Sequence, residues 1–490
     1  MTTKQLFIAA LALLAAGCAA VGPDYRKEPP PVPARFSGLE ADLVRGDPVP
    51  EQVLDSWWHL FDDPLLDSLM ARLVSRNLDL QVASARLLQA RAQLGIAASA
   101  LLPEGEITGE YQRLRRDEAS VLGAAATEAR GREQNFYLAG FDASWEVDLF
   151  GGLRRRIEAA SADLDASEEG LRDTLVSLRG ELARNYIDLR GLQSRIDIAR
   201  REVLTRRDNV DITRERAQAG LTSELDHARA SGELASAEAR IPELERSLKA
   251  ALHRIGVLLG QEPSGLESEL AAAAVLPAAP RDLPVGLPSD LLRHRPDIRR
   301  AERELAAATA RIGVSTAELF PRFFLTGAFG YQSSEGSSLF QDASNFWTYG
   351  PTIRWPIVNF RRILAQIEAS KAVRREVLAR YEQSVLVALE EVENALVALS
   401  REKDRSRSLA EAVRANKLAV SLAMDRYLAG VESYLAVTDA EAALYAAEDQ
   451  SARNRQAQAL ALVALYKALG GGWSATELSR AEAAGKSGGG

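Results

Sequence analysis

Residues 137–149, YLAGFDASWEVDL, alternate between two kinds of side chain. One set is apolar and partly aromatic: Tyr137, Ala139, Phe141, Ala143, Trp145, Val147 and Leu149. A period of two indicates a β-strand with one apolar face. Residues 347–357, WTYGPTIRWPI, alternate in the same way. Shorter alternating runs precede both, with apolar positions Ile107, Tyr111, Phe323, Leu325, Phe329 and Tyr331. The chain therefore carries four predicted strands in two hairpins.

Strands of about ten residues with one apolar, aromatic-rich face suit a transmembrane β-barrel. Four strands are too few to close a barrel, and open edges cannot face lipid because their backbone groups would lack partners. We therefore expect a barrel shared between subunits, with eight strands from two chains or twelve from three. The pattern itself leaves both numbers open. A soluble hairpin resting on a coiled coil is the alternative interpretation.

The strand pairs belong to an internal repeat. Residues 77–80 match 295–298, and Leu101 matches Leu319, both at an offset of 218. Further on the offset is 210, with these pairs: Trp145 and Trp355, Phe150 and Phe360, Gly220 and Gly430, Gly260 and Gly470. Each half therefore has the same plan, and the first half carries eight more residues in its hairpin.

Long helices follow each hairpin. Residues 152–220 contain no proline and carry leucine or isoleucine every seven residues, which is coiled-coil periodicity. Residues 361–428 contain neither proline nor glycine. At a rise of 1.5 Å per residue they would form a helix about 100 Å long. We expect an α+β membrane protein of two tandem repeats, each with a helix, two strands and two helices.

The N-terminus has the features of a secretory signal. Lys4 precedes an apolar run from Leu6 to Ala16, which is too short to cross a bilayer as a helix. Cys18 is the only cysteine, so no internal disulfide is possible. Ala15-Ala16-Gly17-Cys18 resembles a bacterial lipobox, which implies cleavage after residue 17 and lipidation of Cys18. Ala19 in the next position favours the outer membrane.

Composition argues against several classes of function. The formal net charge of −8 makes nucleic acid an unexpected partner. The four histidines are scattered without metal-ligand spacing, and neither a phosphate-binding glycine loop nor a G-x-S-x-G motif occurs. We expect no enzyme activity, no cofactor and no metal site. Without nucleotide sites, any transport through this protein would be passive.

Four motifs carry a family resemblance: CAAVGPDY (18–25), SWWHLFDDPLLDSLM (56–70), RHRPDIRRAERELAAATARIGVSTAELFP (293–321) and LYKALGGGW (465–473). With them the chain resembles the TolC-like outer-membrane factors, in the lipoprotein (NodT-type) branch that serves tripartite drug-efflux systems. The resemblance implies a homotrimer with a twelve-stranded outer-membrane barrel and a long periplasmic helical barrel. It implies a gated conduit for drugs or other small molecules. The partners would be outer-membrane lipid, a periplasmic adaptor protein and an inner-membrane pump of the resistance-nodulation-division type.

Functional residues are expected where the long helices reverse. Gly220 and Gly430 hold helix-ending positions that need a left-handed residue. The resemblance implies that an adaptor docks at the two turns: Gly220, Leu221, Thr222, Ser223, Gly430, Val431, Glu432 and Ser433. It places Asp439 in the constricting ring of the pore gate, and it makes Asp226 and Tyr427 a hydrogen-bonded latch. Glu432 stands where some relatives have a latch arginine, and Ala436 where a second aspartate is common.

The expected organisation has six parts. These are a signal peptide (1–17), a lipid-anchored linker and equatorial segment (18–60), repeat 1 (61–260), an equatorial join (261–290), repeat 2 (291–470) and a flexible tail (471–490). Three other functions remain open: a duct for secreted protein, a route for metal export, and a lipid-anchored coiled-coil scaffold or adhesin.

Overall fold

The structure is a computed structural model that describes residues 20–27, 30–37, 44–45, 49–115, 133–272, 276, 283–284 and 286–474. The predicted signal peptide, Cys18, and most of both the first hairpin loop and the C-terminal tail lie outside the described residues. The chain divides into two compact units. The strand unit holds the described residues of Met1–Glu28, Leu87–Ser167 and Ala301–Tyr381. The helical unit holds those of Pro29–Arg86, Glu168–Arg300 and Glu382–Gly490. Each unit draws on both repeats.

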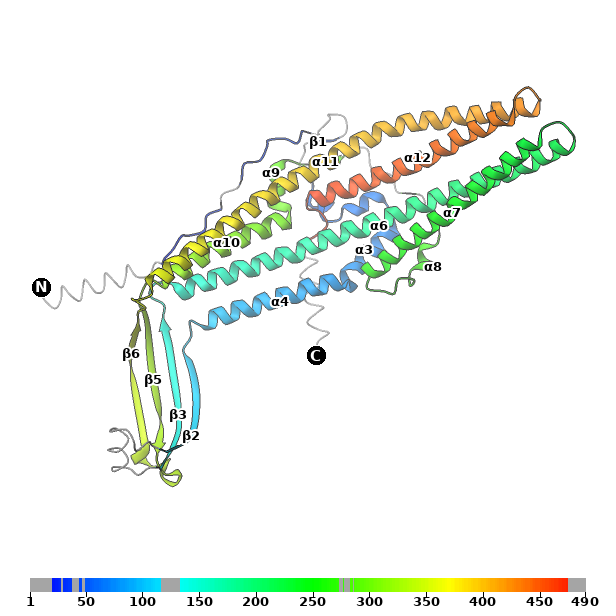
Figure 1. Cartoon of the computed structure of the whole chain (residues 1–490). Coiled ribbons are helices and arrows are strands. Elements are labelled where there is room, and N and C mark those ends of the chain that lie inside the picture. Colours follow the sequence, from blue (N-terminus) through cyan, green and yellow to red (C-terminus); the bar gives the residue numbers. More distant parts are fainter. Residues whose placement is uncertain are drawn as a thin grey trace. The chain divides into compact units, whose positions relative to one another are not determined.

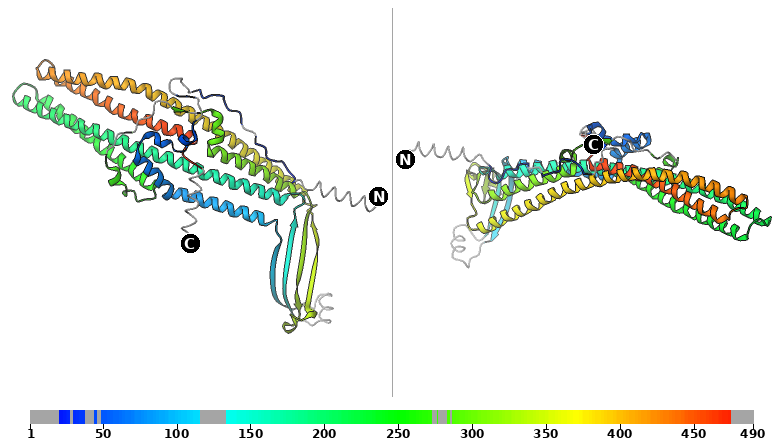
Figure 2. Two further views of the ribbon diagram at one scale, coloured as in Figure 1. Left: turned by 180° about the vertical axis from the view of Figure 1, so that it is seen from behind. Right: turned by 90° about the horizontal axis from the view of Figure 1, so that it is seen from above.

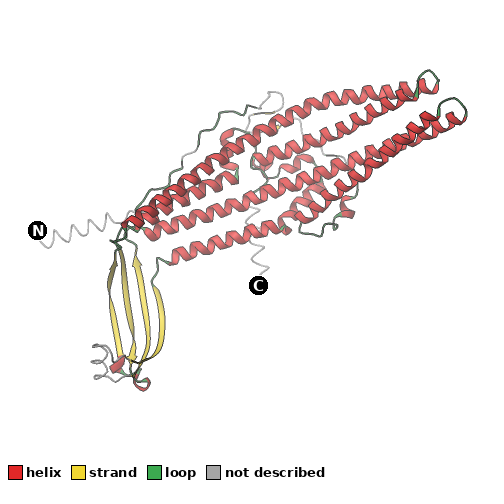
Figure 3. Cartoon of the chain, viewed as in Figure 1, coloured by secondary structure: helices red, strands yellow, loops and turns green. Residues whose placement is uncertain are grey.

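The strand unit contains one antiparallel sheet, seen in yellow in Figure 3. Its four strands lie in the order β2-β3-β5-β6, with bounds Glu104–Arg115, Glu133–Val147, Arg322–Ser333 and Asn345–Arg354. Two hairpins of consecutive strands are joined through β3 and β5, where Phe141 pairs with Phe329. The predicted four strands in two hairpins are confirmed. Among the described residues, β2 and β6 each pair on one side only, so this sheet is open at both edges.

One region of this sheet presents a large apolar surface. A shallow hollow there is lined by Phe141, Ala143, Gly327, Ala328, Phe329, Trp347, Thr348 and Tyr349. Trp347 and Tyr349 stack with ring centroids 5.6 Å apart, and both side chains are mostly exposed. Exposed apolar patches of this kind usually mark an interaction site.

The base of each hairpin is tied to the helix before it by a tryptophan. Trp145 Nε1 donates to the Leu101 carbonyl at 2.9 Å, and Trp355 Nε1 donates to the Leu319 carbonyl at 3.1 Å. Leu101 and Leu319 lie two residues after the ends of these helices, α4 (Leu78–Ser99) and α10 (Pro296–Ala317). The repeats therefore reproduce a specific bond as well as an order of elements.

Four long helices follow the two hairpins. In repeat 1, α6 (Gly152–Gln218, 67 residues) is followed by α7 (Glu224–Leu258). In repeat 2, α11 (Phe360–Leu428, 69 residues) is followed by α12 (Tyr434–Ala468). The predicted single helix over 361–428 is confirmed. Figure 1 shows the α6–α7 and α11–α12 turns at the same end of the helical unit, and both views in Figure 2 agree.

Short elements complete the helical unit. They are α2 (Glu51–Asp55), a 3₁₀ turn (Trp57–Phe61), α3 (Pro64–Arg76), α8 (Glu267–Leu270) and α9 (Pro288–His294). Strands β1 (Val44–Arg45) and β4 (Leu283–Pro284) pair in parallel. The core here includes Trp57, which stacks on Tyr466 at 6.1 Å and 4°. The predicted domain boundaries stay a prediction.

A second matched pair of bonds joins helix ends in this unit. Asn77 Nδ2 donates to the Leu258 carbonyl at 2.8 Å, and Arg295 Nη1 donates to the Ala468 carbonyl at 2.8 Å. Both acceptors lie at the last residue of a long helix, where carbonyls lack helical partners.

Among the described helices, none has an apolar stretch long enough to span a bilayer.

Candidate functional site

The two helical turns share a backbone geometry that their sequences dictate. Gly220 and Gly430 have φ angles of +71° and +72°, and a Cβ at either would meet no atom within 4 Å. Leu221 N donates to the Arg216 carbonyl at 2.8 Å, and Val431 N donates to the Arg426 carbonyl at 3.0 Å. This left-handed ending is the one predicted for both glycines.

The residues expected to dock an adaptor are almost all exposed. Leu221 and Val431, at equivalent positions, are each 67% exposed despite being apolar. Ser223 caps α7 by accepting from Leu225 N at 3.1 Å, whereas Ser433 makes no side-chain cap to α12. Thr222 is half-buried, and its hydroxyl donates to Asp226. Exposed leucine and valine at a helix reversal suit contact with another protein.

The expected gate and latch residues lie close to these turns. Asp439 is exposed on α12, directly after the buried Val437 and Thr438. Tyr427 is buried at the end of α11, and its hydroxyl has no hydrogen-bond partner among the described residues. Asp226 accepts from Thr222 instead. Within one chain the expected Asp226–Tyr427 hydrogen bond is therefore not formed, and the latch role stays a proposal.

A small apolar cluster, here called the tip core, joins all four long helices. It consists of Val210, Ala230, Tyr427, Tyr434 and Val437. Tyr427 and Tyr434 contact edge to face, with centroids 5.4 Å apart and planes at 60°. Burial raises the pKa of Tyr434 to about 12, so its hydroxyl stays protonated at neutral pH. The tip core holds the two helical hairpins of a chain together near their turns.

Further along the helices lies a buried charge cluster that the sequence analysis missed. Arg206 on α6 is 3% exposed, and its Nε donates to Glu202 at 3.3 Å. Its Nη1 lies 3.2 Å from Glu233 and 3.7 Å from Glu441. Arg240 donates to Glu202 at 2.9 Å, and Asn209 donates to Glu441 at 2.7 Å.

The cluster contains three carboxylates and two guanidinium groups. Glu441 is 1% exposed, and its Oε2 has no hydrogen-bond partner in the described structure. Burial raises the pKa of Glu441, although the Asn209 hydrogen bond and the Arg206 charge oppose this shift. Charged residues in a heptad usually face solvent, so nothing in the sequence indicated that these charges would be buried together.

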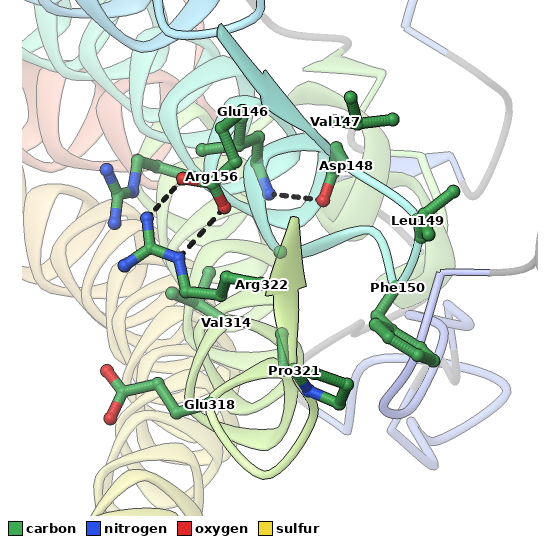
Figure 4. Close-up of a pocket in the computed structure, with 13 residues that line it drawn as sticks. Glu146, Val147, Asp148, Leu149, Phe150, Arg156, Val314, Glu318, Pro321 and Arg322 are labelled. Atoms are coloured by element: carbon green, nitrogen blue, oxygen red, sulfur yellow. Dashed lines mark hydrogen bonds and ion pairs between the residues drawn. The ribbon is translucent and has the colours of Figure 1, made fainter. Parts of the chain in front are cut away.

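The strand unit has a polar pocket where strands meet helices, shown in Figure 4. Arg322 on β5 binds both carboxylate oxygens of Glu146 on β3. Asp148 accepts from Leu153 N at 3.2 Å and Arg154 N at 2.9 Å, which caps the first turn of α6. The charges named here are paired with each other, so we interpret the pocket as a joint between sheet and helices.

An N-terminal arm, residues 20–27, lies on the helices of the strand unit. Arg155 on α6 is buried and binds the Val21 carbonyl at 3.1 Å and Asp24 at 2.6 Å. Gly22 has φ +94°, and a Cβ there would lie 2.5 Å from Gly313 Cα, so only glycine fits. The conspicuous GPDY motif therefore docks the chain that follows Cys18.

Tyr25 and Lys27 fasten the other end of this arm to Glu302 on α10. The Tyr25 hydroxyl donates at 2.7 Å and Lys27 Nζ at 3.0 Å. Burial raises the pKa of Glu302, but the hydrogen bonds from Tyr25, Lys27 and Arg303 outweigh it and hold that pKa below its usual value. Glu302 is therefore an anion at neutral pH and accepts both bonds.

Tyr25→Phe is expected to loosen this arm. A hydrogen bond to a charged group contributes about 1.5–3 kcal/mol, so local opening should become at least about tenfold more frequent. Trypsin cleavage after Arg26 and Lys27, followed by mass spectrometry at pH 8, measures the change. Tyr349→Phe, at an exposed site on β6, is the control. Equal cleavage rates in both variants would contradict the role of Tyr25.

Comparison with solved structures first defines the class of protein. The chain superposes on the outer-membrane channel OprN with a TM-score of 0.86 and 37% sequence identity, over 92% of this chain and 99% of that one. The duplicated plan of two strands and two long helices thus marks the chain as an outer-membrane channel protein.

Among the described residues, no group of three His, Cys, Asp or Glu side chains could hold a metal ion.

Sequence comparison then defines the family. The family model "Outer membrane efflux protein" matches residues 69–261 and 287–471. Nodulation protein T of Rhizobium leguminosarum bv. trifolii is 31% identical over 94% of this chain and 96% of its own length. The toluene efflux pump outer membrane protein TtgF of Pseudomonas putida is 33% identical over 96% and 98%. The chain belongs to the outer membrane efflux protein family, as its motifs predicted, and acts at the outer membrane as an efflux channel.

Proposed function

We propose that the chain is one subunit of a homotrimeric, gated duct that carries small molecules passively out of the cell. The observation that carries this proposal is the pairing of two features in one chain. An open-edged antiparallel sheet suits a membrane, and long helical hairpins end in exposed turns. Neither a scaffold nor an adhesin needs both.

The open edges support an assembly of several chains. Strands β2 and β6 would leave their outer backbone groups unpaired in lipid, which costs several kcal/mol per group. Pairing β6 of one chain with β2 of the next removes this cost. Three chains would contribute twelve strands, which leaves room for a pore, whereas the eight strands of a dimer would enclose a filled interior.

A trimer would bring three copies of Asp439 together around one axis. A ring of carboxylates inside a narrow pore attracts cations and repels anions. The exposure of Asp439, directly after the buried Val437 and Thr438, supports a lumen-facing role. With Ala436 one turn away, this would be a single ring.

The two helical turns and the N-terminus would bind the partners of the duct. The exposed pair Leu221 and Val431 supports docking of a periplasmic adaptor, with Gly220, Thr222, Ser223, Gly430, Glu432 and Ser433 shaping the surface. An inner-membrane pump, of the resistance-nodulation-division type, would provide the energy. A lipidated Cys18 would hold the docked arm at the outer membrane, although one acyl chain alone binds only marginally.

Cargo of small molecules is the choice that the relatives favour. One relative is named a toluene efflux pump component, and another is a pyoverdine export outer membrane protein. Drugs and solvents fall within the same class of cargo, whereas no described cluster suits a metal ion. We therefore place small-molecule efflux ahead of protein secretion and metal export.

Asp439→Ala is expected to raise the conductance of the closed channel several-fold and to weaken its cation selectivity, because the carboxylate ring is lost. Single-channel recording of the purified full-length protein in a planar bilayer measures both. Arg229→Ala is the matched control, since Arg229 holds the equivalent position in repeat 1. Equal effects of the two variants would remove Asp439 from the gate, and a folded oligomer without conductance would overturn the duct.

A further inference from the structure

If the proposed function is correct, opening the duct requires the α6–α7 and α11–α12 hairpins to move relative to each other. Contacts that join the hairpins near their turns then decide how firmly the duct stays closed. The tip core supplies apolar contacts of this kind. Arg216 lies nearer the turns than the Arg206–Glu441 pair and adds a further polar contact from the first hairpin to the second.

Arg216 lies in the last turn of α6 and binds the end of α11 in two ways. Its Nη1 donates to the Leu428 carbonyl at 3.1 Å. Its guanidinium carbon lies 4.9 Å from the centroid of the Tyr427 ring. A cation over an aromatic face at this distance is attracted by the ring quadrupole.

The Leu428 carbonyl is a favourable acceptor because it closes a helix. The preceding carbonyls of Asp425, Arg426 and Tyr427 accept from amides of the turn at about 3.0 Å. Leu428 is the last residue of α11, where an unpaired carbonyl carries part of the negative end of the helix dipole. Arg216 therefore caps a helix of the other hairpin, and its charge strengthens the bond.

The internal repeat explains why this arginine is available. Arg426 holds the equivalent position at the end of α11, and it pairs with Glu432 at 3.3 Å within its own turn. In repeat 1 the residue equivalent to Glu432 is Thr222, which donates to Asp226. Because Thr222 is uncharged, Arg216 has no carboxylate in its own turn at that place and extends to the other hairpin.

We propose that Arg216 is the latch that holds the two hairpins of one chain together in the closed duct. Tyr427 takes part through its ring, which contacts Arg216 and Tyr434, while its hydroxyl is unpaired among the described residues. Opening would break the Arg216–Leu428 bond before the tip core separates.

The test compares Arg216→Gln with Arg426→Gln by single-channel recording of the full-length protein in planar bilayers. Losing a charged hydrogen bond together with a cation–π contact should shift the ratio of open to closed channels about tenfold toward open. Arg426→Gln should change this ratio less than about twofold, because its ion pair is exposed and lies within one turn. Arg216→Lys keeps the charge and one donor, and it should fall between wild type and Arg216→Gln.

A purely structural role predicts a different result. In that case Arg216→Gln would lower the temperature at which the oligomer dissociates in detergent and leave the open fraction of surviving channels unchanged. That outcome would overturn the latch, and so would equal shifts in Arg216→Gln and Arg426→Gln. If wild-type protein forms no channel at all, the proposed function fails and not the assignment of Arg216 alone.

Discussion

Arg206→Met is expected to destabilise the helical unit by about 3–5 kcal/mol, the usual cost of removing one partner from a buried ion pair. Methionine is shorter than arginine but fills much of the same space, so most of the loss comes from the charge and the hydrogen bonds of the guanidinium group. Arg206 lies within ion-pair distance of Glu202, Glu233 and Glu441. Glu202 keeps Arg240, and Glu233 is partly exposed to water. Glu441 keeps only the neutral Asn209, so the penalty falls on Glu441.

The penalty should depend on pH in a defined direction. Burial raises the pKa of Glu441, against the opposing Asn209 hydrogen bond and Arg206 charge. A carboxyl whose folded pKa lies above its unfolded value gains stability at low pH and loses it as pH rises through the folded pKa. Without Arg206 the protonated form is favoured further. The destabilisation should therefore be smaller at pH 5 than at pH 8, and adding Glu441→Gln should recover much of it at pH 8.

Guanidinium unfolding of the full-length protein in detergent, followed by helical circular dichroism, measures these changes. Arg214→Met is the control, since the Arg214–Asp211 pair on the same helix is exposed and should contribute no more than about 1 kcal/mol. Arg206→Met indistinguishable from Arg214→Met would contradict a burial cost at Glu441. A loss that is equal at pH 5 and pH 8 would contradict the assigned proton.

The sequence predicts the parts of this structure that local periodicity and duplication encode. The offset of 210 paired Trp145 with Trp355, and the offset of 218 paired Leu101 with Leu319. In the structure, Trp145 is hydrogen-bonded to Leu101 and Trp355 to Leu319, so the two repeats form equivalent bonds. When both repeats form the same contact, the same residue types occur at equivalent positions, and aligning the two halves of the sequence reveals them.

The buried charge cluster has no equivalent in the other repeat, so aligning the halves does not reveal it. The positions equivalent to Arg206 and Glu441 in the other repeat are Asn416 and Ser231, so the halves do not agree there. Arg206 and Glu441 are far apart in the sequence, on two different helices, α6 and α12. Which charges are buried follows from how four helices rotate against each other, and a heptad pattern does not specify that rotation.

The contact between Arg216 and the end of α11 was not predicted, for a related reason. Both turns carry an arginine four residues before the glycine, and this symmetry suggested equal roles. The difference lies in Thr222 against Glu432, which changes the partner available to each arginine. The Asp226–Tyr427 latch that the resemblance implied is not formed within the chain, where Arg216 contacts Tyr427 instead.

Gly260→Ala is expected to destabilise the helical unit by about 2–5 kcal/mol. Gly260 follows α7 with φ +62°, and a Cβ there would lie 2.5 Å from the Arg76 carbonyl oxygen at the end of α3. The left-handed conformation costs a residue with a Cβ about 1–2 kcal/mol, and forcing backbone atoms apart in a packed site costs about 1–3 kcal/mol more. Asn77 fixes the same junction through the Leu258 carbonyl, so α3 has little freedom to retreat.

Gly220→Ala separates the two costs, because Gly220 has a similar φ of +71° with open space around it. It should lose only about 1–2 kcal/mol in the same guanidinium experiment. Gly470, whose Cβ would lie 2.9 Å from Arg295 Cα, should behave like Gly260, and Gly430 should behave like Gly220. Equal losses at all four glycines would mean that backbone conformation alone decides the cost. Unequal losses would mean that both repeats pack the Gly260 and Gly470 ends of their long helices closely and leave the two turn glycines, Gly220 and Gly430, free of close contacts. The proposed opening of the duct at its tips is compatible with that division.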